Sequence, residues 1–389
     1  MPSRGLRHID RAFAWALIFG LSACWAEPFE PTLEPPSTVD PPPAVEPPPT
    51  DARGFAPGPM RLRRLSATQY RNAVAELLGP EAADAVEVPA TPALNGLRGI
   101  GASELAMSAA DIAAYERAAT TAVETAEAMA PLGPRFLACP AGAESGVCFT
   151  DRIRVALDRA FRRAPTIAEV DRYAAAGQRA IQREGDDDAA LRVVLIAALQ
   201  SPAFLYRIEV GTPIDGPPGF RRLRGFELAS RLSFFLTDRP PDRELRDLAA
   251  RGALQDPEIL GVQADRLLET PAAQKALAAF YDEYLRLSEL TRMVKDPRVY
   301  PMASPELFAD MRTETQALIA SIVWDRDEDF RRMFSAERTT INRRLADLYG
   351  LPSTATTTDD WTSVALPGGQ PRAGLLGHAS FLALNSHPV

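Results

Sequence analysis

The sequence has few of the residues that most enzyme active sites and metal sites use. Of its 389 residues, only three are histidine and three are cysteine. It lacks the Cys-x-x-Cys-His pattern of covalent haem, the His-Glu-x-x-His zinc helix, the Gly-x-Ser-x-Gly elbow and both glycine-rich nucleotide loops. Carboxylates are plentiful, but no pair of them stands apart as an acid and a base. The sequence therefore predicts no catalytic residue, no metal site and no cofactor.

An excess of positive charge is also missing. The formal net charge is −8 at pH 7, and it becomes more negative once the basic N-terminal leader is removed. Nucleic acids attract proteins through their dense negative charge. We therefore expect no nucleic-acid partner.

The apolar run near the N-terminus is too short to span a bilayer. Residues 12–20 are apolar throughout, and Arg4, Arg7 and Arg11 precede them. A charged region followed by a short apolar region is typical of a cleaved export signal. No twin-arginine pair precedes the apolar run, which favours the general secretory route.

The signal ends in Leu21-Ser22-Ala23-Cys24, the pattern that bacterial lipoprotein signals show where a lipid is attached to the thiol before cleavage. We interpret residues 1–23 as a lipoprotein signal peptide and expect the mature protein to begin at Cys24. This predicts a cell-envelope protein that is lipid-anchored to a membrane, in particular the outer membrane, and faces the periplasm or the surface. The alternative is an ordinary signal peptide, or an uncleaved anchor, with an incidental cysteine.

Residues 24–59 are predicted to form a disordered tether. The stretch from Glu27 to Pro59 contains twelve prolines and almost no large apolar side chains. Such a segment cannot bury enough surface to fold, and its proline runs favour an extended polyproline II conformation. A stalk of this kind suits a protein displayed above a membrane. A disordered leader with no anchoring role is the alternative.

The two remaining cysteines, Cys139 and Cys148, flank a short loop that contains glycine and proline. In an exported protein this arrangement is typical of a disulfide. A metal site is the alternative, but two thiols need histidine or carboxylate ligands that this loop lacks.

The body of the chain shows helical periodicity and helix caps almost throughout. Ser66 with Gln69 and Thr166 with Glu169 form capping boxes, and proline follows a capping residue at several other helix starts. The predicted helices are 67–78, 109–129, one opened by Thr150 and Asp151, 166–183, 189–200, 226–236, 243–250, 257–268, 272–287 and 305–324. Strand-like alternation is scarce before residues 361–366. We expect an all-α, irregular multi-helix array with a small irregular or β-containing segment near 352–372.

One charged pair stands out. Glu227 and Arg231 lie four residues apart in a predicted helix that is otherwise dominated by apolar and small residues. Ions on so apolar a helix need partners. Either they form the polar floor of a pocket, or they are a structural pair that ties this helix to its neighbours; the second interpretation is the one we favour.

Several motifs, in order along the chain, resemble those of one family. They are Arg64 to Asn72 with Leu77 to Gly79; Ala160 to Pro165 with Leu199 to Arg207; Glu227 to Leu236 with Pro241 to Leu245; Ile341 to Leu351; and Arg372 to Ala379. The sequence resembles exported planctomycete and myxobacterial proteins built of domains of unknown function 1587, 1595, 1592 and 1588. On this basis we expect helical domains at 60–138, 139–210 (with the loop 139–148) and 220–351, and a truncated fourth domain at 370–389.

The resemblance also bears on completeness and function. The relatives continue past the position of Val389, so we expect this chain to be a fragment or a frameshifted product; a genuine end is the alternative. We expect a binding or assembly module displayed on a stalk, with the membrane and an extracellular polymer as partners. The alternative is an enzyme or redox accessory with a redox partner protein, because some relatives carry cytochrome-c-type segments. Haem staining of the exported chain and a full-length relative would test that alternative.

Overall fold

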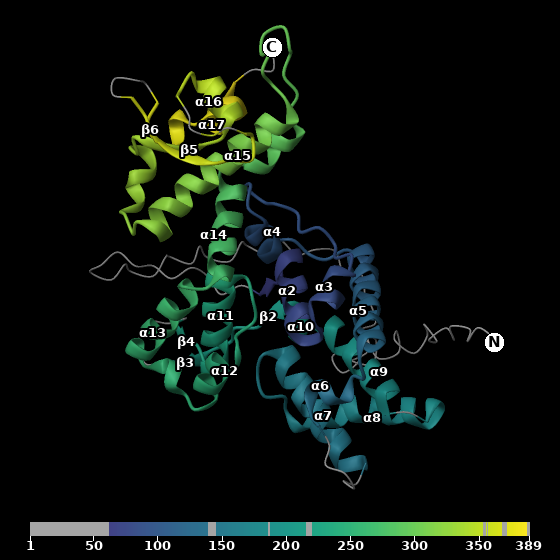
Figure 1. The fold of residues 1–389 in the computed structure, drawn as a ribbon. Helices are drawn as coiled ribbons and strands as arrows, with labels where there is room; N and C mark the ends of the chain where they lie inside the picture. The colour runs from purple at the N-terminus through teal and green to yellow at the C-terminus, as the bar shows by residue number, and fades with distance from the viewer. Residues whose placement is uncertain are drawn as a thin grey trace, which may run out of the picture. The chain divides into compact units, whose positions relative to one another are not determined.

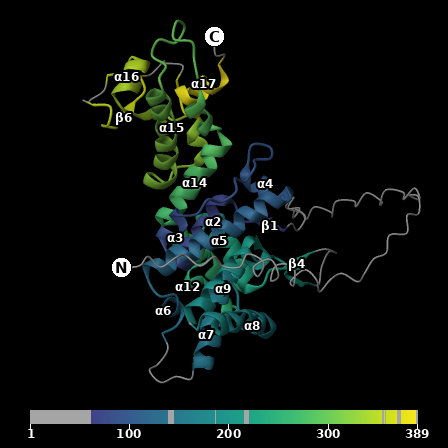
Figure 2. The same cartoon turned by 90° about the vertical axis from the view of Figure 1, so that its right-hand side faces the viewer.

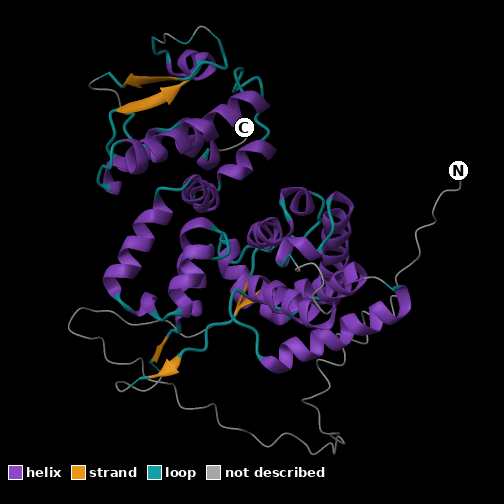
Figure 3. Ribbon diagram, turned by 60° about the horizontal axis from the view of Figure 1, so that its bottom comes forward, coloured by secondary structure: helices purple, strands orange, loops and turns teal. Residues whose placement is uncertain are grey.

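The computed structural model describes residues 62–138, 145–185, 187–214, 220–352, 355, 357–367 and 372–386. Cys24, the predicted tether and Cys139 lie outside the described residues. Helices dominate the described chain, and the strands are few and short (Figure 3). The predicted all-α class is therefore confirmed.

The chain divides into two compact units. The first comprises Met1–Thr91, Leu105–Phe234 and Arg239–Leu260, and the second comprises Pro92–Glu104, Phe235–Asp238 and Gly261–Val389. The boundaries of the four domains inferred from the resemblance stay a prediction. None of the helices in the described residues has both the length and the hydropathy needed to cross a membrane.

The first unit is a helical array with two short ribbons. Its helices, including most of α11, are α2 (Ala67–Leu78), α3 (Pro80–Asp84), α5 (Ala109–Met129), α6 (Gly133–Phe136), α7 (Ser145–Phe161), α8 (Ile167–Glu184), α9 (Asp187–Gln200), α10 (Pro202–Leu205), α11 (Gly225–Thr237), α12 (Arg243–Ala250) and η2 (Ala253–Gln255). Its antiparallel strand pairs are β1 (Arg63–Arg64) with β2 (Tyr206–Arg207), and β3 (Thr212–Pro213) with β4 (Arg221–Arg222). The labels in Figures 1 and 2 follow this order.

Local signals explain where these helices begin and end. Ser66 caps α2 and Thr166 caps α8, each through the reciprocal bonds of a capping box. Gly185 ends α8 in the left-handed conformation at a φ of 74°, which glycine adopts at low cost. The third helix differs from its prediction, since α7 begins at Ser145 and not at Thr150.

The core of the first unit centres on α9, most of whose apolar residues are buried. α9 packs beside α5 and α8. α8 can pack closely against Phe149 of α7 because Gly177 of α8 has no side chain. A Cβ atom at Gly177 would lie 2.7 Å from Cζ of Phe149. The same core includes Tyr70 and Phe204, whose rings meet edge to face with centroids 5.4 Å apart.

The second unit consists of further helices and a β-ribbon. Its elements, including most of α13, are α4 (Arg98–Glu104), α13 (Pro257–Leu268), α14 (Pro271–Tyr284), η3 (Leu287–Arg292), α15 (Pro305–Ala320), the π-helical η4 (Ser321–Asp325), η5 (Phe330–Phe334), β5 (Arg338–Ile341), α16 (Arg343–Tyr349), β6 (Thr362–Ala365), η6 (Leu375–Gly377) and α17 (Ala379–Asn385). β5 pairs antiparallel with β6, which confirms the β-containing segment near 352–372. β5 itself was not predicted.

Two helices end earlier in the structure than the sequence predicts. α14 ends at Tyr284 and not at residue 287, because Arg286 takes a left-handed conformation at a φ of 58° and a 3-10 turn follows. α15 ends at Ala320, where its last predicted turn widens into the π-helical η4. In both cases the apolar pattern continues past the end of the α-helix, so periodicity alone could not locate the end.

Candidate functional site

Glu227 and Arg231 both hold the segment that follows β2. Glu227 accepts hydrogen bonds from the backbone N–H groups of Val210 (3.0 Å) and Gly211 (3.1 and 3.2 Å). It also accepts one from the N–H of Arg224 at 2.7 Å, at the start of its own helix α11. An N–H group that would otherwise lack a partner at a helix start is thereby satisfied.

Arg231 binds the same segment through a side chain. Its Nε donates to Oε2 of Glu209 at 3.0 Å, and its Nη2 donates to the same oxygen. The Glu209 side chain is 3% exposed, whereas that of Arg231 is 48% exposed. The structure therefore brings Glu227 and Arg231 together through residues 209–211. Whether the pair has any functional role stays a prediction.

Glu209 is the residue that the sequence interpretation missed. Its second oxygen, Oε1, is buried and has no hydrogen-bond partner among the described residues. A buried carboxylate oxygen without a donor is costly. The available signal was the alternation of Arg207-Ile208-Glu209-Val210, which places Glu209 on the same side of an extended segment as Arg207.

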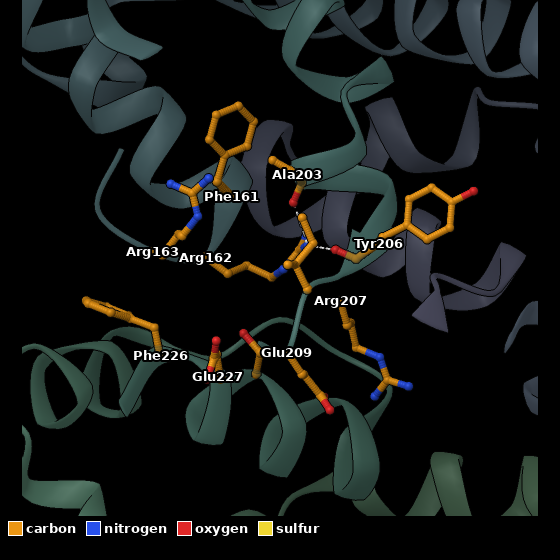
Figure 4. Close-up of a pocket in the computed structure, with 11 residues that line it drawn as sticks. Phe161, Arg162, Arg163, Ala203, Tyr206, Arg207, Glu209, Phe226 and Glu227 are labelled. Carbon is orange, nitrogen blue, oxygen red and sulfur yellow. Dashed lines mark hydrogen bonds between the residues drawn. The ribbon is translucent and has the colours of Figure 1, made fainter. Parts of the chain in front are cut away.

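Arg162 forms the other side of the site (Figure 4). It is buried, and its guanidinium donates to the backbone carbonyls of Ala203 (2.9 Å), Phe204 (3.1 Å) and Tyr206 (3.0 Å). It also lies 5.6 Å from the ring centroid of Phe234. These bonds tie the end of α7 to the corner between α10 and β2.

Burial shifts the ionisation of Arg162, whose backbone conformation is also uncommon. It lowers the pKa of the guanidinium to about 9, with smaller contributions from Arg207 and Arg163, so the group is still charged at pH 7. Its φ of 59° is left-handed, which is uncommon for a residue with a side chain.

A small hollow lies between these groups, with a cavity volume of about 40 Å³. Figure 4 shows Arg162 and Tyr206 on one side and Phe226 and Glu227 on the other. We call it the Glu209 hollow. Its lining residues are Phe161, Arg162, Arg163, Ala203, Tyr206, Arg207, Ile208, Glu209, Phe226, Glu227 and Ser230.

A second polar cluster is buried in the second unit. Glu314 of α15 is fully buried and accepts hydrogen bonds from Thr339 of β5 and Tyr349 of α16, each at 2.6 Å. Beside it, Oγ1 of Thr315 lies 3.1 Å from Nδ1 of His378 and 2.7 Å from Oγ of Ser380. The cluster joins elements that are up to 65 residues apart in sequence.

Burial shapes the chemistry of this cluster. His378 is 3% exposed, and burial lowers the pKa of its imidazole, although Glu314 opposes the shift. Its Nε2 has no hydrogen-bond partner in the described chain and lies 3.9 Å from Oε1 of Glu314. Burial and the neighbouring carboxylate of Glu314 raise the pKa of the Tyr349 hydroxyl. The arrangement is a hydrogen-bonded core with a neutral histidine.

Among the described residues, no group of three or more His, Cys, Asp or Glu side chains is placed to hold a metal ion. Cys148 is buried in α7, and its predicted partner Cys139 lies outside the described residues, so the disulfide stays a prediction.

Comparison with known families agrees with the motifs. Three family models match in order: PSD3, a protein of unknown function (DUF1587), at residues 63–128; PSD5 (DUF1595) at 148–209; and PSD4 (DUF1592) at 223–351. The chain therefore carries these three domains of unknown function in series, as the resemblance implied. The likeness of residues 372–379 to a fourth domain stays a prediction. No curated protein and no solved structure matched the chain.

Proposed function

We propose that this chain is a binding or assembly module displayed at the cell envelope, anchored through Cys24 and raised by residues 24–59. Its partner is an extracellular polymer. The anchor and the stalk are supported by the sequence pattern of residues 1–59. The binding role is supported by an exposed aromatic surface on α14.

The observation that carries the proposal is the pair Phe280 and Tyr284. Their rings stack with centroids 5.6 Å apart and an interplanar angle of 13°, and the residues are 47% and 63% exposed. Tyr281 meets Phe280 edge to face at 5.2 Å and packs against a core cluster of the second unit. We call this surface the α14 aromatic pair. Exposed, rigid aromatic rings are typical of recognition surfaces.

The charged groups around the Glu209 hollow favour the same class of function. Glu227 is occupied by backbone N–H groups, Arg162 by backbone carbonyls, and Arg231 by Glu209. Groups used in this way fix the backbone and are not free to move a proton or attack a substrate. These charged groups therefore favour a role in maintaining the conformation of the site over a role in catalysis.

The test is binding of the full mature chain to a glycan array and to purified envelope polysaccharides. The double variant Phe280→Ala/Tyr284→Ala should weaken polymer binding at least tenfold. Phe235→Ala is the matched control, because Phe235 is 78% exposed but no ring stacks on it among the described residues. Absence of any polymer ligand, or equal binding by the double variant, would count against the proposal.

A further inference from the structure

A third ring holds the α14 aromatic pair in a fixed orientation. The Tyr281 ring stands nearly perpendicular to both rings of the pair, at 73° to Phe280 and at 82° to Tyr284. Tyr281 itself packs against a core cluster of the second unit. Phe280 stacks on one face of the Tyr284 ring, and Tyr284 is 63% exposed, so a flat ligand can cover its other face. Side chains that are ordered before binding lose little freedom when a ligand arrives.

The charged groups beside the pair neutralise each other. Glu283 lies three residues after Phe280, on the same side of α14. It accepts two hydrogen bonds from Arg98 of α4, one from the backbone N–H at 2.9 Å and one from Nε at 2.6 Å. The two Nη groups of Arg98 have no partner among the described residues, and this side chain is 49% exposed. The ion pair therefore offers N–H donors to a ligand without carrying a net charge.

An aromatic face next to donors of no net charge favours a neutral sugar. In β-glucopyranose the hydroxyls are equatorial, so both faces of the ring present C–H groups. Such groups are attracted to the electron-rich face of an aromatic ring. The hydroxyl oxygens at the edge of the sugar can accept hydrogen bonds from the guanidinium of Arg98. A carboxylated sugar would instead bring a negative charge close to Glu283, on a chain whose formal net charge is −8.

We propose that the α14 aromatic pair binds a neutral β-linked glucan, with one glucose ring stacked on Tyr284 and its hydroxyls bonded to Arg98. Phe280 supports the Tyr284 ring from the opposite face. This inference rests on the proposed polymer binding and deepens it, because it names the chemical class of the polymer. It also adds the Arg98–Glu283 ion pair to the binding surface.

The experiment compares matched neutral and charged glucans. Isothermal titration calorimetry measures binding of the full mature chain, in a detergent without a sugar headgroup, to hydroxyethyl cellulose and to carboxymethyl cellulose of the same degree of substitution. Laminarin and its carboxymethyl derivative form the second pair, with a different linkage. We expect at least one neutral glucan to bind, and its carboxymethyl counterpart to bind at least tenfold more weakly.

Two substitutions test the two halves of the surface. Tyr284→Ala should weaken binding of the neutral glucan at least tenfold, whereas Tyr284→Phe keeps the ring and should lose less than threefold. Glu283→Gln leaves the charge of Arg98 uncompensated, so binding of the carboxymethyl glucan should rise at least tenfold. Asp347→Asn is the matched control, because it makes the same change at the exposed Arg343–Asp347 ion pair of α16. This control should discriminate between the two glucans as the wild type does.

The outcomes separate this inference from the proposed function. Equal or tighter binding of the carboxymethyl glucans by the wild type would overturn the neutral class and leave polymer binding in place. Neutral binding that Tyr284→Ala leaves unchanged would overturn the stacking site, and an unchanged discrimination in Glu283→Gln would overturn the role of the ion pair. Binding of neither neutral glucan would overturn the inference as a whole. The proposed function would then still stand if another polysaccharide of the glycan array bound through the α14 aromatic pair.

Discussion

The hydroxyl of Tyr349 donates a 2.6 Å hydrogen bond to Oε2 of Glu314 and accepts one of 3.0 Å from the backbone N–H of Ala379. One side chain thereby joins α16 to α15 and to the start of α17. Glu314 is completely buried, so its charge depends on such donors. Arg372 also lies over the Tyr349 ring, 4.5 Å from its centroid.

Tyr349→Phe should therefore destabilise the protein. The change removes one oxygen but leaves both the Glu314 carboxylate and the Ala379 N–H short of a partner in a buried place. We expect a loss of about 2–4 kcal/mol in the free energy of unfolding, since an unsatisfied buried group costs about 1–3 kcal/mol and more when charged. Urea denaturation followed by circular dichroism measures it.

Tyr70→Phe is the matched control. The Tyr70 hydroxyl is buried in the core of the first unit and has no hydrogen-bond partner among the described residues. Burial raises its pKa, as expected for a phenol held in apolar surroundings. Removing this oxygen should leave stability unchanged or increase it by up to about 1 kcal/mol. Equal losses for the two variants would contradict the distinction between a bonded and an unbonded buried hydroxyl.

Gly177→Ala tests the close packing of α8. Alanine normally stabilises a helix interior by about 1 kcal/mol relative to glycine. At Gly177 the added Cβ would approach Cζ of Phe149 to 2.7 Å, and overpacking of this kind costs about 1–3 kcal/mol. We expect net destabilisation, measured by the denaturation midpoint.

The control lies in α13. A Cβ at Gly261 has nothing within 4 Å, so Gly261→Ala should raise stability by the ordinary helix propensity, about 1 kcal/mol. Opposite signs for the two variants are the expected result. A stabilising Gly177→Ala would mean that α8 and α7 pack less tightly than the structure has them.

His378 makes the second unit sensitive to acid. Burial lowers the pKa of His378 in the folded protein below its ordinary value of 6.5. In the unfolded chain the imidazole takes up a proton near pH 6.5, whereas in the folded state it does so only at lower pH. The unfolded state therefore binds more protons within this window, and stability falls as the pH drops from about 6.5 towards the folded pKa.

The measurement is urea denaturation between pH 7.5 and 5. In His378→Gln the free energy of unfolding should fall less steeply across this pH window, because glutamine does not titrate. Its absolute stability at pH 7.5 will also drop, since Thr315 loses its ring-nitrogen partner. An unchanged pH slope in the variant would show that the acid sensitivity comes from other groups.

The parts of the fold that depend on neighbouring residues were predictable from the sequence. α2, α5, α12 and α13 have the predicted bounds, because caps and apolar spacing act within a few residues. The Glu209–Arg231 bond joins residues 22 apart, and the Thr315–Ser380 contact joins residues 65 apart. Such pairs depend on how the helices pack, which no local pattern specifies. Glu227 and Arg231 could be singled out, but their common partner segment could not.

The predicted disulfide between Cys139 and Cys148 can be tested by thiol titration. The folded, exported chain should show neither thiol reactive before reduction and both reactive after reduction and unfolding. Closure of so short a loop contributes about 2–3 kcal/mol in the chain-entropy description. Cys139→Ser should lower the free energy of unfolding by a similar amount and leave Cys148 as a free thiol that reacts once the chain is unfolded. A freely reactive Cys139 in the exported wild type would contradict the pairing.

Cys24→Ala tests the anchor. If a lipid is attached to the Cys24 thiol before signal cleavage, the variant cannot be lipidated, and metabolic labelling with a fatty-acid analogue should be lost. The variant should then leave the membrane fraction and appear in the soluble fraction, because a lipid chain buries apolar carbon at about 0.8 kcal/mol per CH₂ group and nothing in the predicted tether replaces it. Cys148→Ser is the control and should remain labelled and membrane-bound. Membrane retention of Cys24→Ala would show that another segment, such as an uncleaved apolar stretch at residues 12–20, holds the chain.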